Sequence, residues 1–341
     1  MRAFKVPRGL LVSACVAMGL LLLMPVGAMA TASPAGYGAP TTLGIELQSV
    51  ACPSSTQCTA VGYPGEVTFN PTSPGTPTPN PIDSRHRLRS VACPSSTQCT
   101  AGDNEGREVT FNPTSPGTNA SPAIGLDFSV ELLSLACPSS TQCTAVGSEG
   151  EVTFNPTSPG TPTPTLTGPG YLFSVACPSS TQCTAVGDVG EVTFNPTSPG
   201  TPTPNPIDSF NGLGSVACPS RRQCTAVDWH GQEVTFNPTS SATPTPTLIG
   251  GGELKPVACP SRRQCTAVNR EGREVTFNPT SPGTPTPTLI VPYPGSPTEF
   301  RSVACPSRRQ CTAVNGEGLE VTFNPTSPGI PTPTPTVLPG R

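Results

Sequence analysis

Seven cysteine pairs in this chain have a spacing that could support either disulfide or metal chemistry. Five residues separate the two cysteines of every pair. Zinc sites rarely use this spacing, and only His86 and His230 are available as histidine ligands. We therefore expect one disulfide in each repeat, no metal site and no cofactor. The expected bridges are Cys52–Cys58, Cys93–Cys99, Cys137–Cys143, Cys177–Cys183, Cys218–Cys224, Cys259–Cys265 and Cys305–Cys311.

The triplet Asp228-Trp229-His230 contains the only tryptophan of the chain and falls in a turn between two expected strands. Exposed aromatic rings stack on sugars or anchor protein partners. We therefore predict a ligand contact at this triplet. The alternative is that Trp229 fills a gap near the mouth of a ring.

Three repeats carry paired arginines between their cysteines, where the other four carry Ser-Thr. Guanidinium groups on adjacent repeats form a cationic patch that could bind an anionic wall polymer, an acidic glycan or an acidic protein. Duplication of a block of repeats would give the same pattern without any function. The pairs are Arg221-Arg222, Arg262-Arg263 and Arg308-Arg309.

No catalytic triad, carboxylate pair or phosphate-binding loop stands out in the sequence. One glutamate recurs in every repeat, but identical groups suit structure better than catalysis, which needs groups with different pKa values. We predict no catalytic residue. The recurring glutamates are Glu66, Glu108, Glu151, Glu191, Glu233, Glu274 and Glu320.

These residues belong to seven near-copies of one unit. The string Ala-Cys-Pro-Ser-x-x-Gln-Cys-Thr-Ala recurs at intervals of 40 to 46 residues, and Glu-Val-Thr-Phe-Asn-Pro-Thr-Ser follows each copy. Such periods with short β-type runs are typical of propellers. In the first repeat we expect strands at 48–52, 58–62 and 66–70. The sequence thus predicts an all-β, seven-bladed propeller over residues 41–341, with core phenylalanines at Phe69 and its equivalents.

A fourth strand is expected in the Thr-Pro-Thr-Pro segment 76–79. An edge strand can turn each proline towards solvent and each threonine N–H towards its neighbour. The alternative is a polyproline-type linker. Residues 41–48 and the proline-rich tail 331–339 further suggest that one end of the chain completes a blade begun by the other.

Residues 1–30 have the pattern of a secretory signal peptide. Arg2, Lys5 and Arg8 precede an apolar run, and Ala28-Met29-Ala30 resembles a cleavage site. The apolar run of about 15 residues is shorter than the roughly 20 that span a bilayer, and an uncleaved anchor is the alternative. We expect cleavage after residue 30, a flexible segment at 31–40, and a secreted, extracellular monomer without a membrane span.

Charge and cysteine count agree with this expectation. Removing residues 1–30 takes away Cys15, which leaves an even fourteen cysteines, and changes the net charge from −3 to −6. Even cysteine counts suit disulfide frameworks of exported chains. Nucleic acid is not an expected partner, because phosphate binding needs a basic surface.

The strings Ser-Val-Ala-Cys-Pro-Ser, Gln-Cys-Thr-Ala-Val-Gly and Gly-Glu-Val-Thr-Phe resemble bacterial secreted repeats related to photosystem II assembly factor propellers and sialidase-type Asp-box propellers. The resemblance covers residues 49–341 and implies a seven-bladed propeller with a role in binding or assembly. The Asp-box is degenerate, since residues 72–77 keep its glycine but lack its aspartate and tryptophan. The arginine cluster and tyrosine nucleophile of sialidases have no counterpart.

We expect a non-enzymatic propeller that recognises an extracellular glycan or protein. Variation between the copies is concentrated in the second turn of each repeat and in the connections between repeats, which would share one face. Function often lies on loops held by a rigid scaffold, although neutral drift produces the same variation. Two alternatives remain. A secreted glycoside hydrolase or lyase would place carboxylates at the central channel, and a structural cell-wall or matrix protein would have no discrete ligand.

Overall fold

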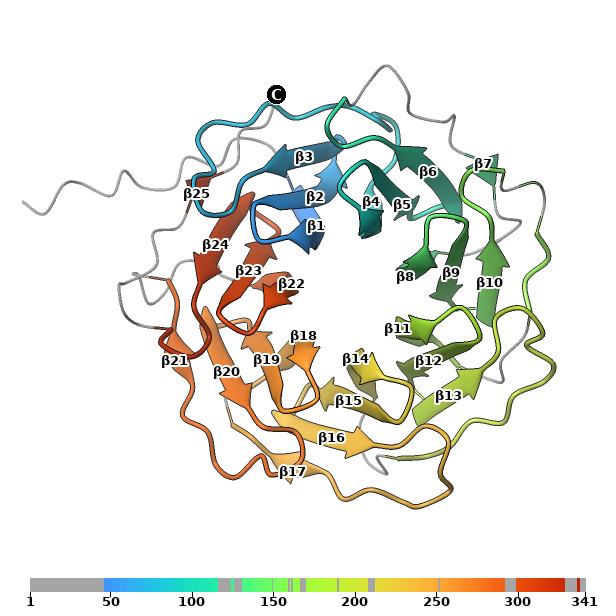
Figure 1. Cartoon of the computed structure of the whole chain (residues 1–341), viewed down its shortest axis with the longest axis vertical. Helices are drawn as coiled ribbons and strands as arrows, with labels where there is room; N and C mark the ends of the chain where they lie inside the picture. Colours follow the sequence, from blue (N-terminus) through green and yellow to red (C-terminus); the bar gives the residue numbers. More distant parts are fainter. Residues whose placement is uncertain are drawn as a thin grey trace, which may run out of the picture. The chain divides into compact units, whose positions relative to one another are not determined.

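The repeats fold into seven antiparallel sheets arranged around a common axis, as the computed structural model shows (Figure 1). The structure describes residues 46–115, 124–125, 131–148, 150–158, 160, 162–165, 170–188, 190–207, 212–250, 252–291, 299–328 and 336–337. The signal peptide expected at 1–30 and the segment at 31–40 lie outside these residues. Each sheet is one blade, and we number the blades one to seven in chain order.

Every blade consists of strands that follow one another in the chain. Blades one, three and four have three strands each: β1 (Glu46–Ser54), β2 (Gln57–Tyr63), β3 (Glu66–Phe69); β8 (Leu132–Ser139), β9 (Gln142–Gly147), β10 (Gly150–Phe154); β11 (Leu172–Ser179), β12 (Gln182–Gly187), β13 (Gly190–Phe194).

The other four blades have a short fourth strand. Their strands are β4 (Leu88–Ser95), β5 (Gln98–Asp103), β6 (Arg107–Phe111), β7 (Ile124–Gly125); β14 (Leu213–Ser220), β15 (Gln223–Asp228), β16 (Gln232–Phe236), β17 (Thr247–Leu248); β18 (Leu254–Ser261), β19 (Gln264–Asn269), β20 (Arg273–Phe277), β21 (Thr288–Leu289); β22 (Phe300–Ser307), β23 (Gln310–Asn315), β24 (Leu319–Phe323), β25 (Thr336–Val337). The predicted seven-bladed all-β fold is confirmed.

One disulfide joins the first and second strands of every blade. The Cα atoms of each pair lie 4.1 Å apart, because antiparallel pairing brings the end of one strand beside the start of the next. All seven predicted bridges are present: Cys52–Cys58, Cys93–Cys99, Cys137–Cys143, Cys177–Cys183, Cys218–Cys224, Cys259–Cys265 and Cys305–Cys311. Seven disulfides indicate an oxidising compartment. None of the described segments forms a helix long and apolar enough to cross a membrane.

The outermost strand is not where the proline pattern placed it. In blade one, segment 76–79 forms no strand, and the single outer bridge joins Glu66 to Asn80, just after the last proline. In blade five, β17 likewise begins at Thr247, directly after the Thr-Pro run. Proline donates no ladder hydrogen bond and holds φ near −65°. Only every second residue of the run keeps an N–H, the run forms no strand, and the outer pairing begins just beyond it.

A belt of serine hydroxyls joins successive blades near the axis. The Oγ of Ser49 accepts a hydrogen bond from the backbone N–H of Val91 in the next blade, at 3.2 Å. Equivalent bonds run from Leu135 to Ser90, Val175 to Ser134, Val216 to Ser174, Val257 to Ser215 and Val50 to Ser302. Only between blades six and seven does the pattern lapse, because Pro256 stands where the serine would be.

A second belt runs along the turns between first and second strands. The Nε2 of Gln57 donates to the carbonyl oxygen of Ser96 in the next blade, at 2.8 Å. The same bond links Gln98 to Ser140, Gln142 to Ser180, Gln182 to Arg221, Gln223 to Arg262, Gln264 to Arg308 and Gln310 to Ser55. The last bond joins blade seven to blade one and closes the ring.

Ring closure uses no exchanged strand among the described residues. β1 is the innermost strand of blade one, and β25 pairs within its own blade seven. The expectation that one end of the chain completes a blade begun by the other is therefore wrong. The two blades meet as all other neighbours do, through side-by-side packing of β1 and β22 (Figure 1).

The apolar core lies between blades. In blade five, Leu213, Val216 and Phe236 pack with Val186 of blade four, and at the closure Val314 of blade seven packs with Leu47 of blade one. Each blade thus completes its core with its neighbour. The phenylalanines predicted as core residues are all buried: Phe69, Phe111, Phe154, Phe194, Phe236, Phe277 and Phe323.

Removing a single bridge tests the contribution of the disulfides. The double substitution Cys218→Ala and Cys224→Ala should lower the free energy of unfolding by about 2 kcal/mol, because the bridge closes a short loop in the unfolded chain. Denaturant titration of the purified protein measures this. Free thiols in the native protein, or bridges mapped between repeats, would contradict the assignment.

Candidate functional site

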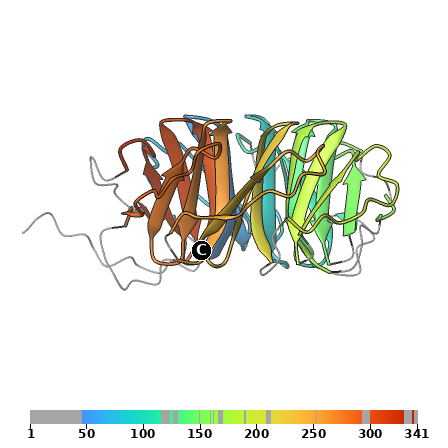
Figure 2. The same cartoon turned by 90° about the horizontal axis from the view of Figure 1, so that it is seen from below.

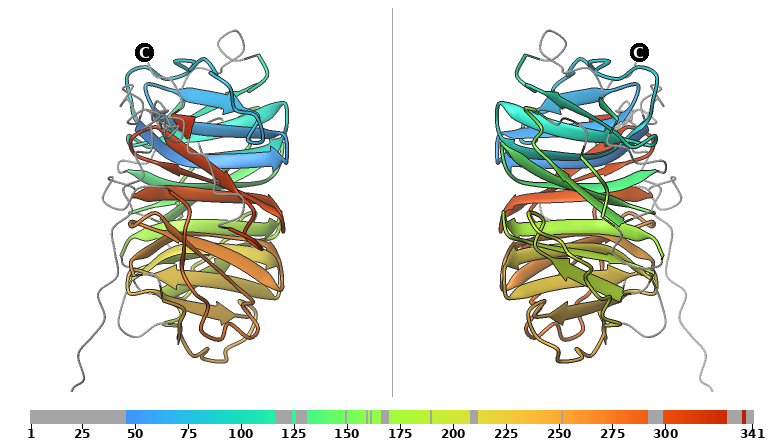
Figure 3. Two further views of the ribbon diagram at one scale, coloured as in Figure 1. Left: turned by 90° about the vertical axis from the view of Figure 1, so that its left-hand side faces the viewer. Right: turned by 90° about the vertical axis from the view of Figure 1, so that its right-hand side faces the viewer.

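The two ends of the blades form two chemically different faces. The strands run from one face to the other (Figures 2 and 3). We call the end with the Cys-Pro-Ser turns and the Asn-Pro-Thr-Ser loops, such as 53–56 and 70–73, the arginine face. The opposite end, with turns such as 229–231 and parts of the connections between blades such as 249–250, is the variable face. β15 connects the two, since Arg222 precedes it and Trp229 follows it.

A cavity of about 530 Å³ lies on the ring axis and is lined by the first strands of all seven blades. One lining position, four residues before the first cysteine, carries a different kind of side chain from blade to blade, whereas the next position is serine in six of the seven. Sequence comparison of the repeats could have found this position, but we had assigned variation only to turns. The variable residues are Gln48, Arg89, Leu133, Phe173, Gly214, Lys255 and Arg301.

Three aromatic rings gather on one side of the cavity. Phe173 lies between Tyr171, whose ring is stacked at a centroid distance of 6.2 Å, and Trp229, whose ring is tilted at 5.5 Å. Tyr171 is 48% exposed and Trp229 is 39% exposed. Trp229, a predicted contact, thus reaches the cavity wall, and it brings with it two aromatic residues that were not predicted.

One of the two glycines near Trp229, Gly214, makes room for its indole. A Cβ atom on Gly214 would lie 2.8 Å from Nε1 of Trp229, closer than real contacts allow. A Cβ on Gly212 would lie 3.7 Å from the indole, an ordinary contact. Trp229 therefore occupies the space that side chains of β14 would otherwise fill, while more than a third of its surface stays exposed.

The neighbours of Trp229 have other roles. Asp228 is 1% exposed, and its Oδ1 accepts hydrogen bonds from the N–H groups of His230 and Gln232 at 2.9 and 2.8 Å. It caps the turn that presents Trp229. His230 is exposed, with Nδ1 3.9 Å from Oδ2 of Asp228. Asp103, Asn269 and Asn315 cap the equivalent turns in the same way.

Charged side chains gather on blades six and seven, beginning on the blade next to the one that carries Trp229. Lys255 Nζ lies 2.6 Å from Oε1 of Glu299, while Arg270 lies 3.0 Å from Glu299 and 2.9 Å from Glu253. Although burial by itself raises it, the pKa of Glu299 is lowered to about 2 by the hydrogen bonds that Lys255 and Arg270 donate. The Glu299 carboxylate is therefore ionised and held in ion pairs.

The remaining charges near the cavity also have partners. Arg89 pairs with Glu131, and Arg87 pairs with Glu46 at 2.7 Å. Arg301 donates to Oε1 of Gln48 at 2.7 Å, across the seam between blades seven and one. The described rim thus combines an aromatic side with a polar side whose charges are largely compensated.

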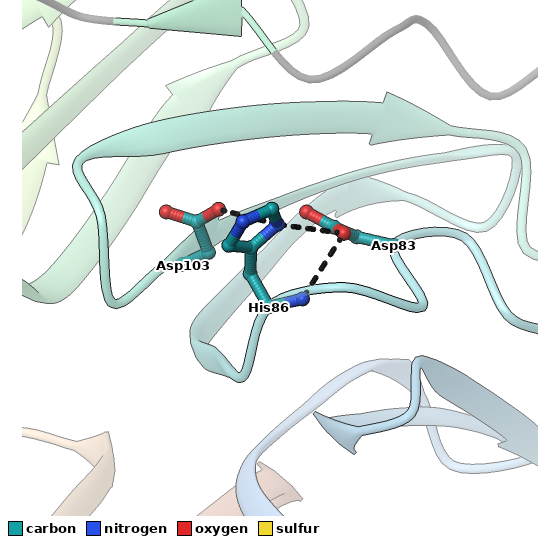
Figure 4. Close-up of side chains that lie close together, drawn as sticks. All are labelled: Asp83, His86 and Asp103. Carbon is teal, nitrogen blue, oxygen red and sulfur yellow. Dashed lines mark hydrogen bonds and ion pairs between the residues drawn. The ribbon is translucent and has the colours of Figure 1, made fainter.

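Asp83, His86 and Asp103 form a compact cluster between blades one and two (Figure 4). His86 Nδ1 lies 3.1 Å from Oδ1 of Asp83. Arg107 already contacts both carboxylates, at 2.7 Å from Asp103 and 3.2 Å from Asp83. Burial raises the pKa of Asp103 to about 6. The donor set could bind a cation, but the guanidinium fills that role here, so the cluster secures the connection to blade two.

The recurring glutamates are buried in the blades. Thr68 donates to Oε2 of Glu66 at 2.9 Å and also contacts Thr59, and Asn80 donates to Oε1 at 2.8 Å. Burial raises the pKa of this carboxyl to about 7, despite the opposing effect of these hydrogen bonds. The pKa values of Glu108, Glu151, Glu233 and Glu274 are raised to about 7 by the same cause.

These glutamates should make the protein more stable in mild acid. Their pKa values are near 7 in the folded chain and near 4.5 when unfolded, so between these values the folded state holds more protons. Stability should therefore fall as the pH rises from about 4.5 to 7 and stay lower above it. Thermal unfolding from pH 5 to 8 measures the slope. Glu233→Gln should flatten it, whereas a slope of opposite sign would contradict these pKa values.

The six predicted arginines lie together on blades five, six and seven. The first of each pair is anchored: Nε of Arg221 donates to Oε1 of Gln182 in the preceding blade, at 3.2 Å. Arg262 and Arg308 make the same bond with Gln223 and Gln264. The second of each pair, Arg222, Arg263 and Arg309, is exposed. The structure thus places these arginines and the Trp229 turn on opposite faces.

Known proteins resemble this chain in fold but not in sequence. No model of a known protein family matches the chain, and no curated protein sequence matches it. Among solved structures, YCF48 from Cyanidioschyzon merolae, a photosystem II assembly factor, has a TM-score of 0.65 at 13% identity. The match covers 85% of this chain and 98% of that one.

Two further structures belong to the same class. U3-55K has a TM-score of 0.61 at 10% identity, with 70% of this chain and 78% of that one covered. The RRP9 WD40 repeats have a TM-score of 0.61 at 11% identity, covering 75% and 82%. Together with the seven blades and the axial cavity, these similarities define the protein as a β-propeller, and at such identities they establish the fold alone.

Proposed function

We infer that the protein is a secreted, non-enzymatic recognition propeller that binds a neutral glycan at the rim of the axial cavity on the variable face. The observation that carries this inference is the exposed pair of aromatic residues, Tyr171 and Trp229, beside a cavity of about 530 Å³. Aromatic faces stack on the C–H faces of sugars, and convergent polar groups then bind the hydroxyls.

The charge distribution supports a neutral ligand. Lys255, Glu299, Arg270 and Glu253 compensate one another beside the aromatic rings. A charged ligand would have to break these pairs, whereas sugar hydroxyls hydrogen bond to paired charges without separating them. A protein ligand is the alternative occupant, since aromatic residues also anchor protein interfaces.

Binding fits this rim better than glycoside hydrolysis does. Hydrolysis needs one carboxylic acid with a raised pKa facing the sugar. Glu299, which faces the cavity, has a pKa lowered to about 2, and the glutamates with raised pKa values are buried within the blades. An inert structural repeat is also less suitable, because such a protein needs no aromatic rim.

The relation to Asp-box propellers stays part of this proposal. The Asn-Pro-Thr-Ser loop follows the third strand, where those propellers carry their Asp-box. In blade one, Oδ1 of Asn70 accepts hydrogen bonds from the N–H and hydroxyl of Thr72 at 3.0 and 2.8 Å. An asparagine thus organises the turn in place of the aspartate. Secretion is supported by the disulfides and by the signal pattern at 1–30.

Removal of the indole tests the binding site directly. The mature protein should bind one or more members of an array of neutral oligosaccharides, and Trp229→Ala should weaken that binding about tenfold because a stacking face is lost. Titration calorimetry with the best array ligand measures the loss. Equal affinity of the variant, or an array without any bound sugar, would overturn the proposal in favour of a protein ligand.

A glycine pair supplies a matched test that leaves the aromatic residue intact. Gly214→Ala should displace the indole, since the new Cβ would lie 2.8 Å from Nε1 of Trp229, and should weaken oligosaccharide binding. Gly212→Ala should bind normally, because its nearest neighbour would lie 3.4 Å away. If both variants bind alike, the position of Trp229 is unimportant for the ligand.

A further inference from the structure

Charge is segregated between the two faces of the ring. All six arginines of the turns at 221–222, 262–263 and 308–309 are exposed. The seven Cys-Pro-Ser turns and the seven Asn-Pro-Thr-Ser loops contain no aspartate or glutamate at all. On a protein that is acidic overall, the arginine face is thus cationic over three adjacent blades, and none of its six arginines has an ion pair within the described part of the chain.

The fold fixes the position of half of these arginines. Nε of Arg221 donates to Gln182, and Nε2 of the same glutamine donates back to the carbonyl oxygen of Arg221. The pairs Arg262 with Gln223 and Arg308 with Gln264 repeat this reciprocal contact. Each Nε is engaged in the blade contact, while the terminal nitrogens of the guanidinium form no ion pair among the described residues. The side chains are therefore preorganised, which lowers the entropy cost of binding.

The arginine face lacks the features that hold a polypeptide. The large hydrophobic residues that are exposed in the described parts, Tyr63, Tyr171, Trp229 and Leu248, lie on the variable face or at the outer strand. Protein interfaces usually need an aromatic or aliphatic anchor, and added strands need a free sheet edge. The outer strands are at the rim of the ring (Figure 1). Among the described residues this face carries guanidinium groups, serine and threonine hydroxyls, and short proline, asparagine and glutamine side chains, without a large apolar anchor.

We propose that the arginine face binds an anionic glycan, a polysaccharide with carboxylate or sulfate groups on successive sugar units. Guanidinium groups repeated once per blade match charges repeated along a chain, and the fork geometry of arginine suits carboxylate and sulfate oxygens. Neighbouring hydroxyls, such as that of the exposed Ser307, can bond to the sugar. This site is separate from the rim at Trp229, so either site can exist without the other.

Other repeats of the same chain show which substitution should remove these arginines without disturbing the turn. Arg222 and Arg263 stand where blades one to four have threonine, and the turn bond from N–H to serine Oγ is the same for Thr56 and Arg263. The double substitution Arg222→Thr and Arg263→Thr therefore removes two charges but keeps the turn. The control, Arg85→Thr with Arg273→Thr, removes two charges from the variable face.

Binding to immobilised polygalacturonate and dextran sulfate is measured by surface plasmon resonance, with neutral dextran and polyglutamate as comparison surfaces. Both anionic glycans should bind the native protein. The Arg222/Arg263 variant should lose about tenfold in affinity. The slope of the logarithm of affinity against the logarithm of salt concentration should become shallower by about one for each arginine removed, as counterion release predicts. The control and Trp229→Ala should change affinity less than twofold.

Three results would overturn the proposal. Equal losses in the arginine-face variant and its control would mean that overall charge alone governs binding. Polyglutamate bound as tightly as polygalacturonate would assign the face to an acidic polypeptide. No binding to either anionic glycan would leave the arginines without this role. None of these results bears on the neutral oligosaccharide site, which Trp229→Ala tests separately.

Discussion

The whole molecule depends on the contacts that join each blade to the next. A single blade has three or four short strands and one disulfide, and in six of the seven the core is completed by a valine of the neighbouring blade. The serine and glutamine belts add hydrogen bonds at the axis and at the arginine face, across the closure as elsewhere. Because this repeated framework carries the stability, residues such as Phe173 and Arg222 can differ between blades without disturbing it.

Most of the architecture could be predicted because the residues that form it recur at the same positions of every repeat. The cysteine spacing determines which strands are neighbours, and the alternation of Val67 and Phe69 around Thr68 indicates a strand packed on its neighbours. The pattern of strand and turn residues in one repeat is weak evidence for a blade, and its recurrence in seven copies makes the prediction strong. The same copies indicated that the recurring glutamates are structural, in agreement with the threonine bonds and burial of Glu66.

What failed depends on geometry that a repeat does not encode. The Thr-Pro segment satisfies the polarity of an edge strand, but its prolines remove every second N–H, and the outer pairing of blade one is a single bridge at Asn80. Asp228 has the chemistry of a ligand contact yet lies below the turn that it caps. The aromatic rim was missed because Tyr171 and Phe173 are on one blade and Trp229 on the next, and only the packing of these two blades shows that they meet.

Native-state amide hydrogen exchange tests ring closure most directly, at the serine belt. The N–H of Val50 donates to Ser302 across the seam between blades one and seven. A closed ring predicts that this amide is as well protected as those of Val91 and Val216, which make the same bond within the ring. If Val50 instead exchanges as fast as the exposed turn amides, the seam is open and the closed propeller is contradicted.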